Sequence, residues 1–85
     1  MSHPRPKPKK LAAKLLAIRQ RLGLSQSQLI KRFGLESSGL YIESARISEY
    51  EHGTREPSLI VLLAYARVAK IRLEKIVDDD LNLPY

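Results

Sequence analysis

The side chains that most often carry catalysis or hold metal ions are scarce in this sequence. It has no cysteine, which excludes thiolate nucleophiles and thiolate metal sites, and only two histidines, His3 and His52. Two histidines are too few for the usual zinc sites, and neither a Ser/His/Asp set nor a glycine-rich phosphate loop accompanies them. The consecutive aspartates Asp78, Asp79 and Asp80 would point in different directions on a helix, which is typical of a solvated helix end. We therefore expect no enzymatic activity, no metal ion and no cofactor.

Basic groups are concentrated in the first part of the chain. The formal net charge is +6, from 15 basic and 9 acidic residues. Residues 1–32 carry nine of the basic groups and no acid, whereas residues 33–85 have a net charge of −3. Such a one-sided field suits a polyanion, either nucleic acid or an anionic membrane surface. A solvated basic tail on an ordinary helical domain would have the same composition, so charge alone does not decide between these interpretations.

The sequence shows neither of the usual membrane or export signals. No apolar run approaches the roughly 18–20 residues that span a bilayer. The first ten residues are basic and proline-rich and lack the apolar stretch of a signal peptide. We therefore expect a soluble cytoplasmic protein with no membrane partner.

The spacing of apolar residues predicts five short helices around one core. In the first of them, Leu11, Leu15, Ile18 and Leu22 follow one another at intervals of four, three and four residues. A chain of 85 residues has no room for a second core of useful size. Alternating prolines near the start predict a disordered basic arm over residues 1–8, followed by one domain over 9–78 and a C-terminal tail over 79–85. The expected helices cover about residues 9–22, 26–33, 44–52, 59–69 and 72–77.

The first two helices should meet at a sharp turn. Gly23 stands where a left-handed residue would end the first helix. Ser25 and Gln28, three residues apart, form the pattern of a capping box, in which each side chain bonds an orphan amide of the other residue. Leu24 and Leu29 flank this pattern at the spacing of a hydrophobic staple. The second helix therefore begins at about residue 26 and stops at Gly34.

Three motifs now stand in order along the chain. They are Leu22-Gly23-Leu24-Ser25-Gln26, then Ile47-Ser48-Glu49-Tyr50-Glu51-His52-Gly53, then Pro57-Ser58-Leu59. Together they resemble the phage-repressor/Cro (XRE-type) helix-turn-helix family over roughly residues 11–78. The resemblance implies an all-α, five-helix lambda-repressor-like DNA-binding domain. The sequence departs from the family pattern before the third helix, where the loop is longer by about six residues, 36–41. This insert could reposition the third helix, contact DNA or contribute to a protein interface.

The resemblance implies that the third helix is the recognition helix, covering about residues 44–52 in the major groove. Its side chains nearest to base edges would be Ser44, Ala45, Arg46 and Glu49. The fork of Arg46 matches the two acceptors of guanine, and Glu49 could accept from a cytosine amino group. Ala45 could touch a thymine methyl group, and Ser44 could serve a base or a phosphate. Alternatively, Arg46 and Glu49 could simply pair with each other on one helix face.

Other residues would hold the DNA backbone or the fold. Gln26 begins the second helix, where backbone amides and the helix dipole favour phosphate, and Ser25 caps it. The resemblance assigns backbone contacts to Arg55 and to the amide of Thr54. It also implies a partly buried salt bridge that joins Arg19 to Glu51 and sets the angle of the recognition helix. The basic arm would add only non-specific attraction to DNA.

These features favour a sequence-specific transcriptional regulator of double-stranded DNA that is associated with the nucleoid when bound. A recognition helix covers only a half-site, so a homodimer on an inverted-repeat operator is the economical expectation. An antitoxin that binds its operator through the same fold is an alternative. A protein-interaction adaptor that has lost DNA binding is another, and acidic Glu43, Glu49 and Glu56 near the expected contact face favour it. In that case the partner would be an unknown protein.

Overall fold

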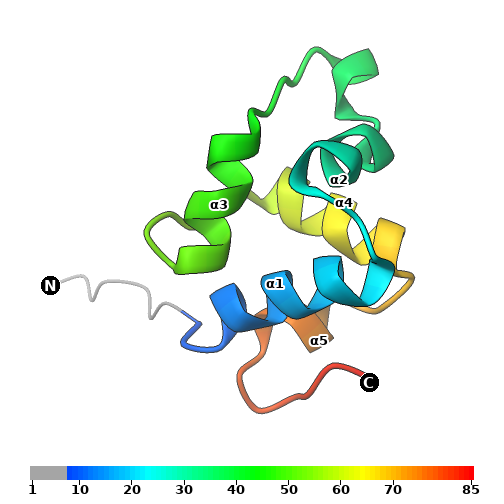
Figure 1. Ribbon diagram of the computed structural model, residues 1–85. Helices are drawn as coiled ribbons and strands as arrows, with labels where there is room; N and C mark the ends of the chain where they lie inside the picture. Colours follow the sequence, from blue (N-terminus) through cyan, green and yellow to red (C-terminus); the bar gives the residue numbers. More distant parts are fainter. Residues whose placement is uncertain (1–7) are drawn as a thin grey trace, which may run out of the picture.

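The computed structural model describes residues 8–85, so the predicted arm over 1–8 lies almost entirely outside the described residues. Within this part of the chain there are five α-helices and no strand, as the sequence predicts (Figure 1). The all-α prediction is confirmed for these residues. The elements are α1 (Leu11–Leu22), α2 (Gln26–Phe33), a short 3-10 helix η1 (Leu35–Ser38), α3 (Ser44–His52), α4 (Leu59–Ala69) and α5 (Leu73–Val77).

Local signals set most of the helix boundaries. The Ser25 hydroxyl accepts from the amide of Gln28 at 3.1 Å, and the Gln28 side chain accepts from the amide of Ser25 at 2.8 Å. This is the predicted capping box, and it starts α2 at the expected residue. Gly53, at a φ of 75°, ends α3 in the left-handed region that glycine adopts without a steric penalty. The turn geometry that positions α2 and α3 is therefore encoded locally.

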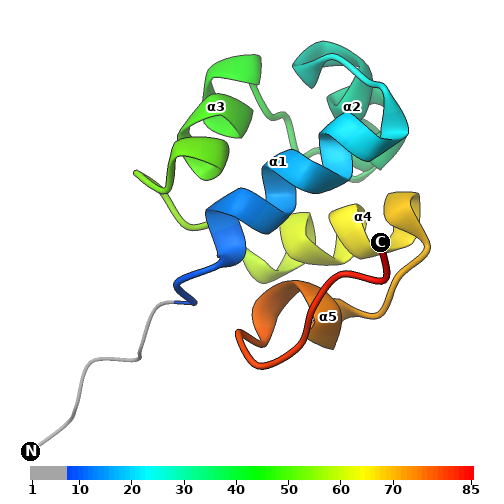
Figure 2. The ribbon, with the colours of Figure 1, turned by 60° about the horizontal axis from the view of Figure 1, so that its bottom comes forward.

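The core lies between the five helices, with α1 packed against α3, α4 and α5, and α2 packed against α3 and α4 (Figure 2). Tyr65 of α4 is fully buried, and its ring meets that of Phe33 edge to face, with 4.9 Å between centroids. This contact holds α2 against α4. The side chains that are essentially inaccessible to solvent come from all five α-helices: Leu15, Ile18, Leu29, Ile47, Tyr65 and Ile76.

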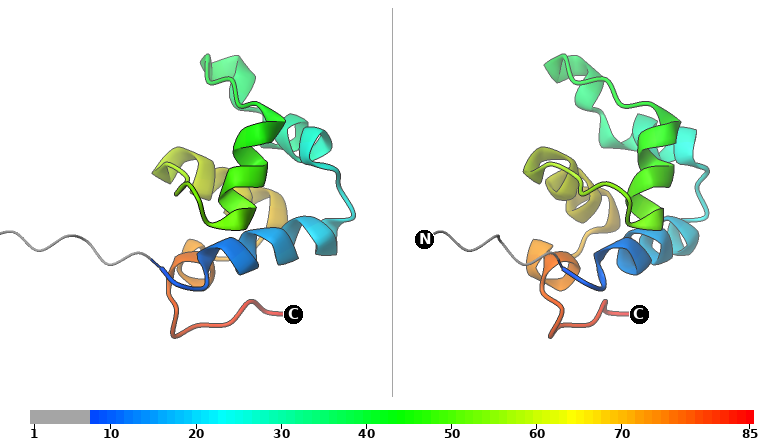
Figure 3. Two further views of the ribbon diagram at one scale, coloured as in Figure 1. Left: turned by 60° about the vertical axis from the view of Figure 1, so that its left-hand side comes forward. Right: turned by 90° about the vertical axis from the view of Figure 1, so that its left-hand side faces the viewer.

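Two boundaries differ from the sequence prediction. The stretch 35–41 was expected to be an irregular loop, but residues Leu35–Ser38 form η1, closed by a bond from the Gly39 amide to the Glu36 carbonyl at 2.9 Å. The segment projects beyond the ends of α2 and α3 (Figures 1 and 3). The first helix begins at Leu11 rather than residue 9. The amides of Lys9 and Lys10, just before this first turn, bond to a side chain from the other end of the chain.

That side chain is Asp79, in a C-terminal segment that is packed onto α1. Beyond α5, residues 79–85 run alongside α1 (Figure 3). The Lys14 Nζ, on a side chain that is nearly fully buried, donates to the Leu81 carbonyl at 2.7 Å, and the Arg21 guanidinium lies 5.1 Å from the centre of the Tyr85 ring. The predicted tail is thus held by contacts to the first helix.

The stability of the fold should fall in acid through Asp79. Its carboxylate accepts from the amide of Lys9 at 2.8 Å and from that of Lys10 at 3.0 Å, and these bonds lower the pKa of Asp79 below its ordinary value of 3.8. Because the folded state favours the ionised form, this stabilisation is complete above the ordinary pKa and is lost as pH falls through the lowered value. We expect Asp79→Asn to lower Tm at neutral pH, with the difference from the parent chain vanishing in strong acid.

Asp80→Asn is the matched control for this experiment. Asp80 is exposed, and among the described residues no backbone amide donates to its carboxylate. Thermal unfolding of the parent and both variants between neutral and acidic pH measures the effect. A Tm difference for Asp79→Asn that stayed constant at every pH would contradict the ionised cap.

Candidate nucleic-acid interface

Helix α3 turns one face to the core and leaves its leading residues in solvent. Ile47 is fully buried and Tyr50 is 7% exposed, and this side of the helix is packed against α1 and α2. Ile47 and Tyr50 are three residues apart and mark the buried face of the helix, so the opposite face points into solvent. The exposed leading residues are those predicted to face bases: Ser44, Ala45 and Arg46. The structure therefore leaves the predicted base-reading end of α3 accessible.

Glu49 binds two arginines at this surface. Its Oε2 accepts from Arg55 Nε at 2.6 Å and lies 3.5 Å from Arg46 Nη1. The bond from Arg55, followed by the charges of both arginines, lowers the pKa of Glu49, so its carboxylate is ionised at neutral pH. The pairing of Arg46 with Glu49, which the sequence left open as an alternative, is thus present, but its nitrogen–oxygen distance is long. The shorter bond goes to Arg55, which the chain brings to α3 through the turn after Gly53.

Thr54 already uses its donors within the fold. Its amide donates to the Glu49 carbonyl at 3.0 Å, and its hydroxyl donates to the same oxygen at 3.3 Å. Both bonds belong to the cap that ends α3. The phosphate contact expected from the Thr54 amide would therefore need this cap to open, and the hydroxyl is the group of Thr54 that can turn outward.

The start of α2 offers unpaired donors next to α3. Ser25 is exposed and engaged in the capping box, whereas Gln26 is half-buried. The amides of Gln26 and Ser27 have no acceptor among residues 8–85, as expected for the first turn of a helix. The Gln26 Nε2 donates to Glu51 Oε1 at 3.3 Å, which holds this side chain beside α3. The positive end of α2 and the outer face of α3 thus form adjoining parts of one surface.

A salt bridge locks this arrangement. Arg19 Nε donates to Glu51 Oε2 at 2.6 Å and Arg19 Nη2 to Glu51 Oε1 at 2.9 Å, while Nη1 donates to the Leu24 carbonyl at 3.1 Å. The Glu51 side chain is only 4% exposed. Hydrogen bonding to Glu51 raises the pKa of Arg19, so the guanidinium stays charged. The pair expected from the sequence therefore connects α1, the turn before α2, and α3.

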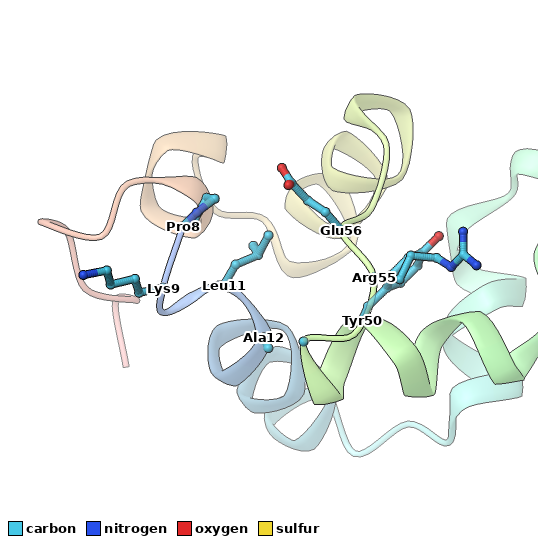
Figure 4. Close-up of a pocket in the computed structure, with 8 residues that line it drawn as sticks. Pro8, Lys9, Leu11, Ala12, Tyr50, Arg55 and Glu56 are labelled. Atoms are coloured by element: carbon cyan, nitrogen blue, oxygen red, sulfur yellow. The ribbon is translucent and has the colours of Figure 1, made fainter. Parts of the chain in front are cut away.

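A shallow pocket lies between the start of α1 and the turn after α3. Pro8 and Lys9 line it together with Arg55 and Glu56, and the Arg55 guanidinium is directed away from Pro8 and Lys9 (Figure 4). Its volume of about 140 Å³ is small beside the roughly 300 Å³ at which small-molecule sites begin. Over residues 8–85, no three His, Cys, Asp or Glu side chains cluster as metal ligands. Over the same range, no helix is long and apolar enough to cross a membrane.

Two contacts of this surface were not foreseen from the sequence. The bond between Gln26 and Glu51 and the bond between Arg55 and Glu49 each join residues on different elements. Arg55 is separated from Glu49 by a helix end and a turn, so helical spacing gives no signal for the pair. Both bonds place a predicted DNA-contacting side chain against a carboxylate of α3.

Comparison with known proteins agrees with this geometry. The sequence model of the helix-turn-helix family matches residues 15–76. A solved structure of the P22 c2 repressor in complex with a synthetic operator is similar, with a TM-score of 0.67 and 23% sequence identity. The match covers 82% of this chain and 96% of the repressor chain. At this identity the likeness shows a common fold. None of the curated proteins matches this chain at a significant level.

Proposed function

Because this chain belongs to the helix-turn-helix family, we propose that it is a sequence-specific transcriptional regulator that binds double-stranded DNA. The observation that carries this proposal is the exposed leading end of α3, with Ser44, Ala45 and Arg46 in solvent beside the unpaired amides at the start of α2. A recognition helix reads base edges with such leading residues, and a helix N-terminus binds a phosphate. Gln26, Arg55 and the Thr54 hydroxyl then contact the DNA backbone.

The proposal extends to assembly and location. One α3 helix of nine residues covers only a half-site, so a homodimer binds an inverted repeat with its two recognition helices one turn of DNA apart. The protein acts in the cytoplasm, on DNA in the nucleoid, and works by binding rather than by catalysis. Selection of duplexes from a random pool tests this proposal. A symmetric motif is expected, and a pool with no enriched sequence would contradict specific recognition.

Arg46 should determine one position of the selected motif. A bidentate contact between arginine and guanine is worth about 1–3 kcal/mol of discrimination, so Arg46→Ala should weaken binding to the selected duplex about 5- to 150-fold. Binding to an unrelated duplex should change much less. Affinities measured for both duplexes at several salt concentrations check this, together with a repeated selection in which one position becomes degenerate.

Arg72→Ala is the control for this prediction, because Arg72 is exposed and lies at the start of α5, away from α3. The two variants should unfold at similar temperatures. Equal losses of affinity for both duplexes in Arg46→Ala would assign Arg46 to the phosphate backbone instead of a base.

The acidic side chains at the interface support a second candidate, a protein-interaction adaptor. In the free protein Glu49 pairs with Arg46 and Arg55 and offsets part of their positive charge. This pairing weakens the attraction of the surface for phosphate. Salt dependence separates the two functions. A DNA-binding protein loses affinity with a log–log slope of about −0.9 for each phosphate that it neutralises. An adaptor would bind no duplex even at low salt.

A further inference from the structure

A groove between the end of α2 and the outer face of α4 has no part in the proposed DNA contacts. Its volume of about 370 Å³ lies in the range of ligand-binding sites, roughly 300–1,000 Å³. The groove is bordered by α2 and η1 on one side and by α4 on the other, away from the leading end of α3. Apolar side chains form its floor: Phe33, Leu35, Ile60, Leu63, Ala64 and Val68.

The floor follows one face of α4. The stripe begins at Ile60 and continues three, four and seven residues later with Leu63, Ala64 and Arg67. At the rise of an α-helix it is continuous and about 10 Å long. Ile60 is 53% exposed and is among the large apolar side chains that the described fold leaves in solvent. An apolar stripe of this length and direction matches the face of a second helix, which binds through residues at the same spacing.

The rim of the groove is basic. Arg32 at the end of α2, Arg67 on α4 and Lys70 just after it line the groove, and none of the residues that line it is acidic. All three cations are exposed, and within the part of the chain that the structure describes none of them takes part in an ion pair. An apolar floor with an unneutralised basic rim is complementary to a ligand that is apolar on one side and acidic at its edges.

We propose that this groove is a docking site for an acidic amphipathic helix of a partner protein. The apolar floor argues against nucleic acid, because phosphates require donors and gain nothing from aliphatic side chains. The stripe along α4 argues against a small anion, because a compact ligand would leave Ile60 or Val68 uncovered. A second copy of this chain would have to offer a helix with a free apolar face beside its acids. Its helix α5, which carries Glu74, packs Ile76 into the core and so presents no such face.

A designed peptide supplies the probe. It has about 14 residues, four helical turns, with leucines at i, i+3, i+4 and i+7 and glutamates on both flanks. A scrambled peptide of the same composition and a peptide with lysine in place of every glutamate are the comparisons. Binding of the fluorescent peptides to the full chain is followed by anisotropy, and the contacted residues are identified from amide shifts in NMR spectra. The acidic amphipathic peptide is expected to bind with shifts confined to the groove.

Charge reversal on the rim then tests the contact. Arg67→Glu should weaken binding of the acidic peptide by at least about tenfold, since like charges would face each other. Arg72→Glu makes the same charge change outside the groove, at an exposed position, and should alter binding by less than about twofold. Ile60→Gln removes an apolar contact without changing charge and should also weaken binding. Circular dichroism verifies that each variant is folded.

Several results would overturn the proposal. Equal binding of the scrambled peptide, equal effects of Arg67→Glu and Arg72→Glu, or shifts outside the groove would each do so. So would tight binding of decanoate at the groove when the peptide does not bind, because the occupant would then be a small anion. The complex with a selected duplex provides the last test, and the peptide should still bind it. Displacement of the peptide by the duplex would assign the basic rim to DNA. If the protein binds no duplex at all, the proposed DNA-binding function fails, but the peptide result still stands.

Discussion

The Glu51→Ala variant is expected to lose about 3–5 kcal/mol of unfolding free energy, since removing one partner of a buried ion pair leaves the other charge uncompensated. Arg19 would keep its single bond to the Leu24 carbonyl and lose both bonds to the carboxylate. The charge left behind is that of Arg19, whose side chain is 20% exposed, so water reaches part of the guanidinium and the loss should lie toward the lower end of this range. For a domain of this size each kcal/mol shifts Tm by about 4–8 °C, so the expected fall exceeds about 12 °C.

Glu49→Ala is the control for this prediction, because it removes a carboxylate from the same helix. Glu49 also binds arginines, but its side chain is 37% exposed, and exposed pairs contribute about 0–1 kcal/mol. Thermal and denaturant unfolding of the two variants measure the difference. Equal melting temperatures would show that the pair of Arg19 and Glu51 is no more important than a surface contact.

Loss of Glu51 should also affect DNA binding beyond its effect on stability. Glu51 Oε1 accepts from both Arg19 and Gln26, so one carboxylate joins α1 and α2 to α3. Glu51→Gln keeps a side chain of similar shape that can still accept from Arg19 and is expected to be intermediate in stability. At a temperature where both variants are folded, a weaker duplex affinity for Glu51→Ala would indicate that the carboxylate positions α2 and α3 for DNA.

The sequence predicted the helices well because their boundaries depend on local chemistry. The bonds of Ser25 and Gln28 close within three residues, and the glycines after α1 and α3 end those helices by their own backbone freedom. Even the Arg19–Glu51 pair, 32 residues apart, was accessible through its likeness to a known family pattern. The 3-10 helix Leu35–Ser38 was missed, since four residues with two serines carry no helical period.

Contacts that neither helical spacing nor the family resemblance indicates could not be predicted. Arg55 turned out to pair with Glu49, and the groove beside α4 arises only when the end of α2 is packed against it. The spacing of Ile60, Leu63 and Ala64 indicates a stripe, but a stripe alone does not tell whether another element covers it. A run of aspartates at the end of α5 was expected to be solvated, yet Asp79 caps the start of α1, 70 residues earlier.

Lys14 is the second position where a large effect is expected. Its side chain is nearly fully buried, and its Nζ donates to the carbonyls of Lys75 and Asp78 at 2.8 Å each and of Leu81 at 2.7 Å. The first two carbonyls belong to the end of α5, where a helix lacks internal donors. One ammonium therefore satisfies the end of α5 and fastens the C-terminal segment to α1. The period of α1 does place this lysine on the buried face, three residues after Leu11 and four before Ile18, but a lysine at such a position gives no sign of which acceptors it will meet.

Lys14→Met keeps the length of the side chain and removes all three donors. Hydrogen bonds to charged groups are worth about 1.5–3 kcal/mol each, and the recovered cost of burying the ammonium offsets part of that sum. We expect the free energy of unfolding to fall by about 2–4 kcal/mol. Amide exchange should locate the effect, because α5 and residues 79–85 should lose protection before α3 does.

Lys31→Met provides the matched control, since Lys31 is exposed on α2 and its change should stay within about 0.5 kcal/mol. A double variant of Lys14→Met and Asp79→Asn tests whether these two residues fasten the same segment or hold independent parts of the chain. Both residues fasten the same segment to α1, so their effects should add up to less than the sum of the single losses. Strict additivity would mean that the two contacts hold independent parts of the chain. Unchanged amide protection of α5 in Lys14→Met would contradict the role of Lys14 as the cap of that helix.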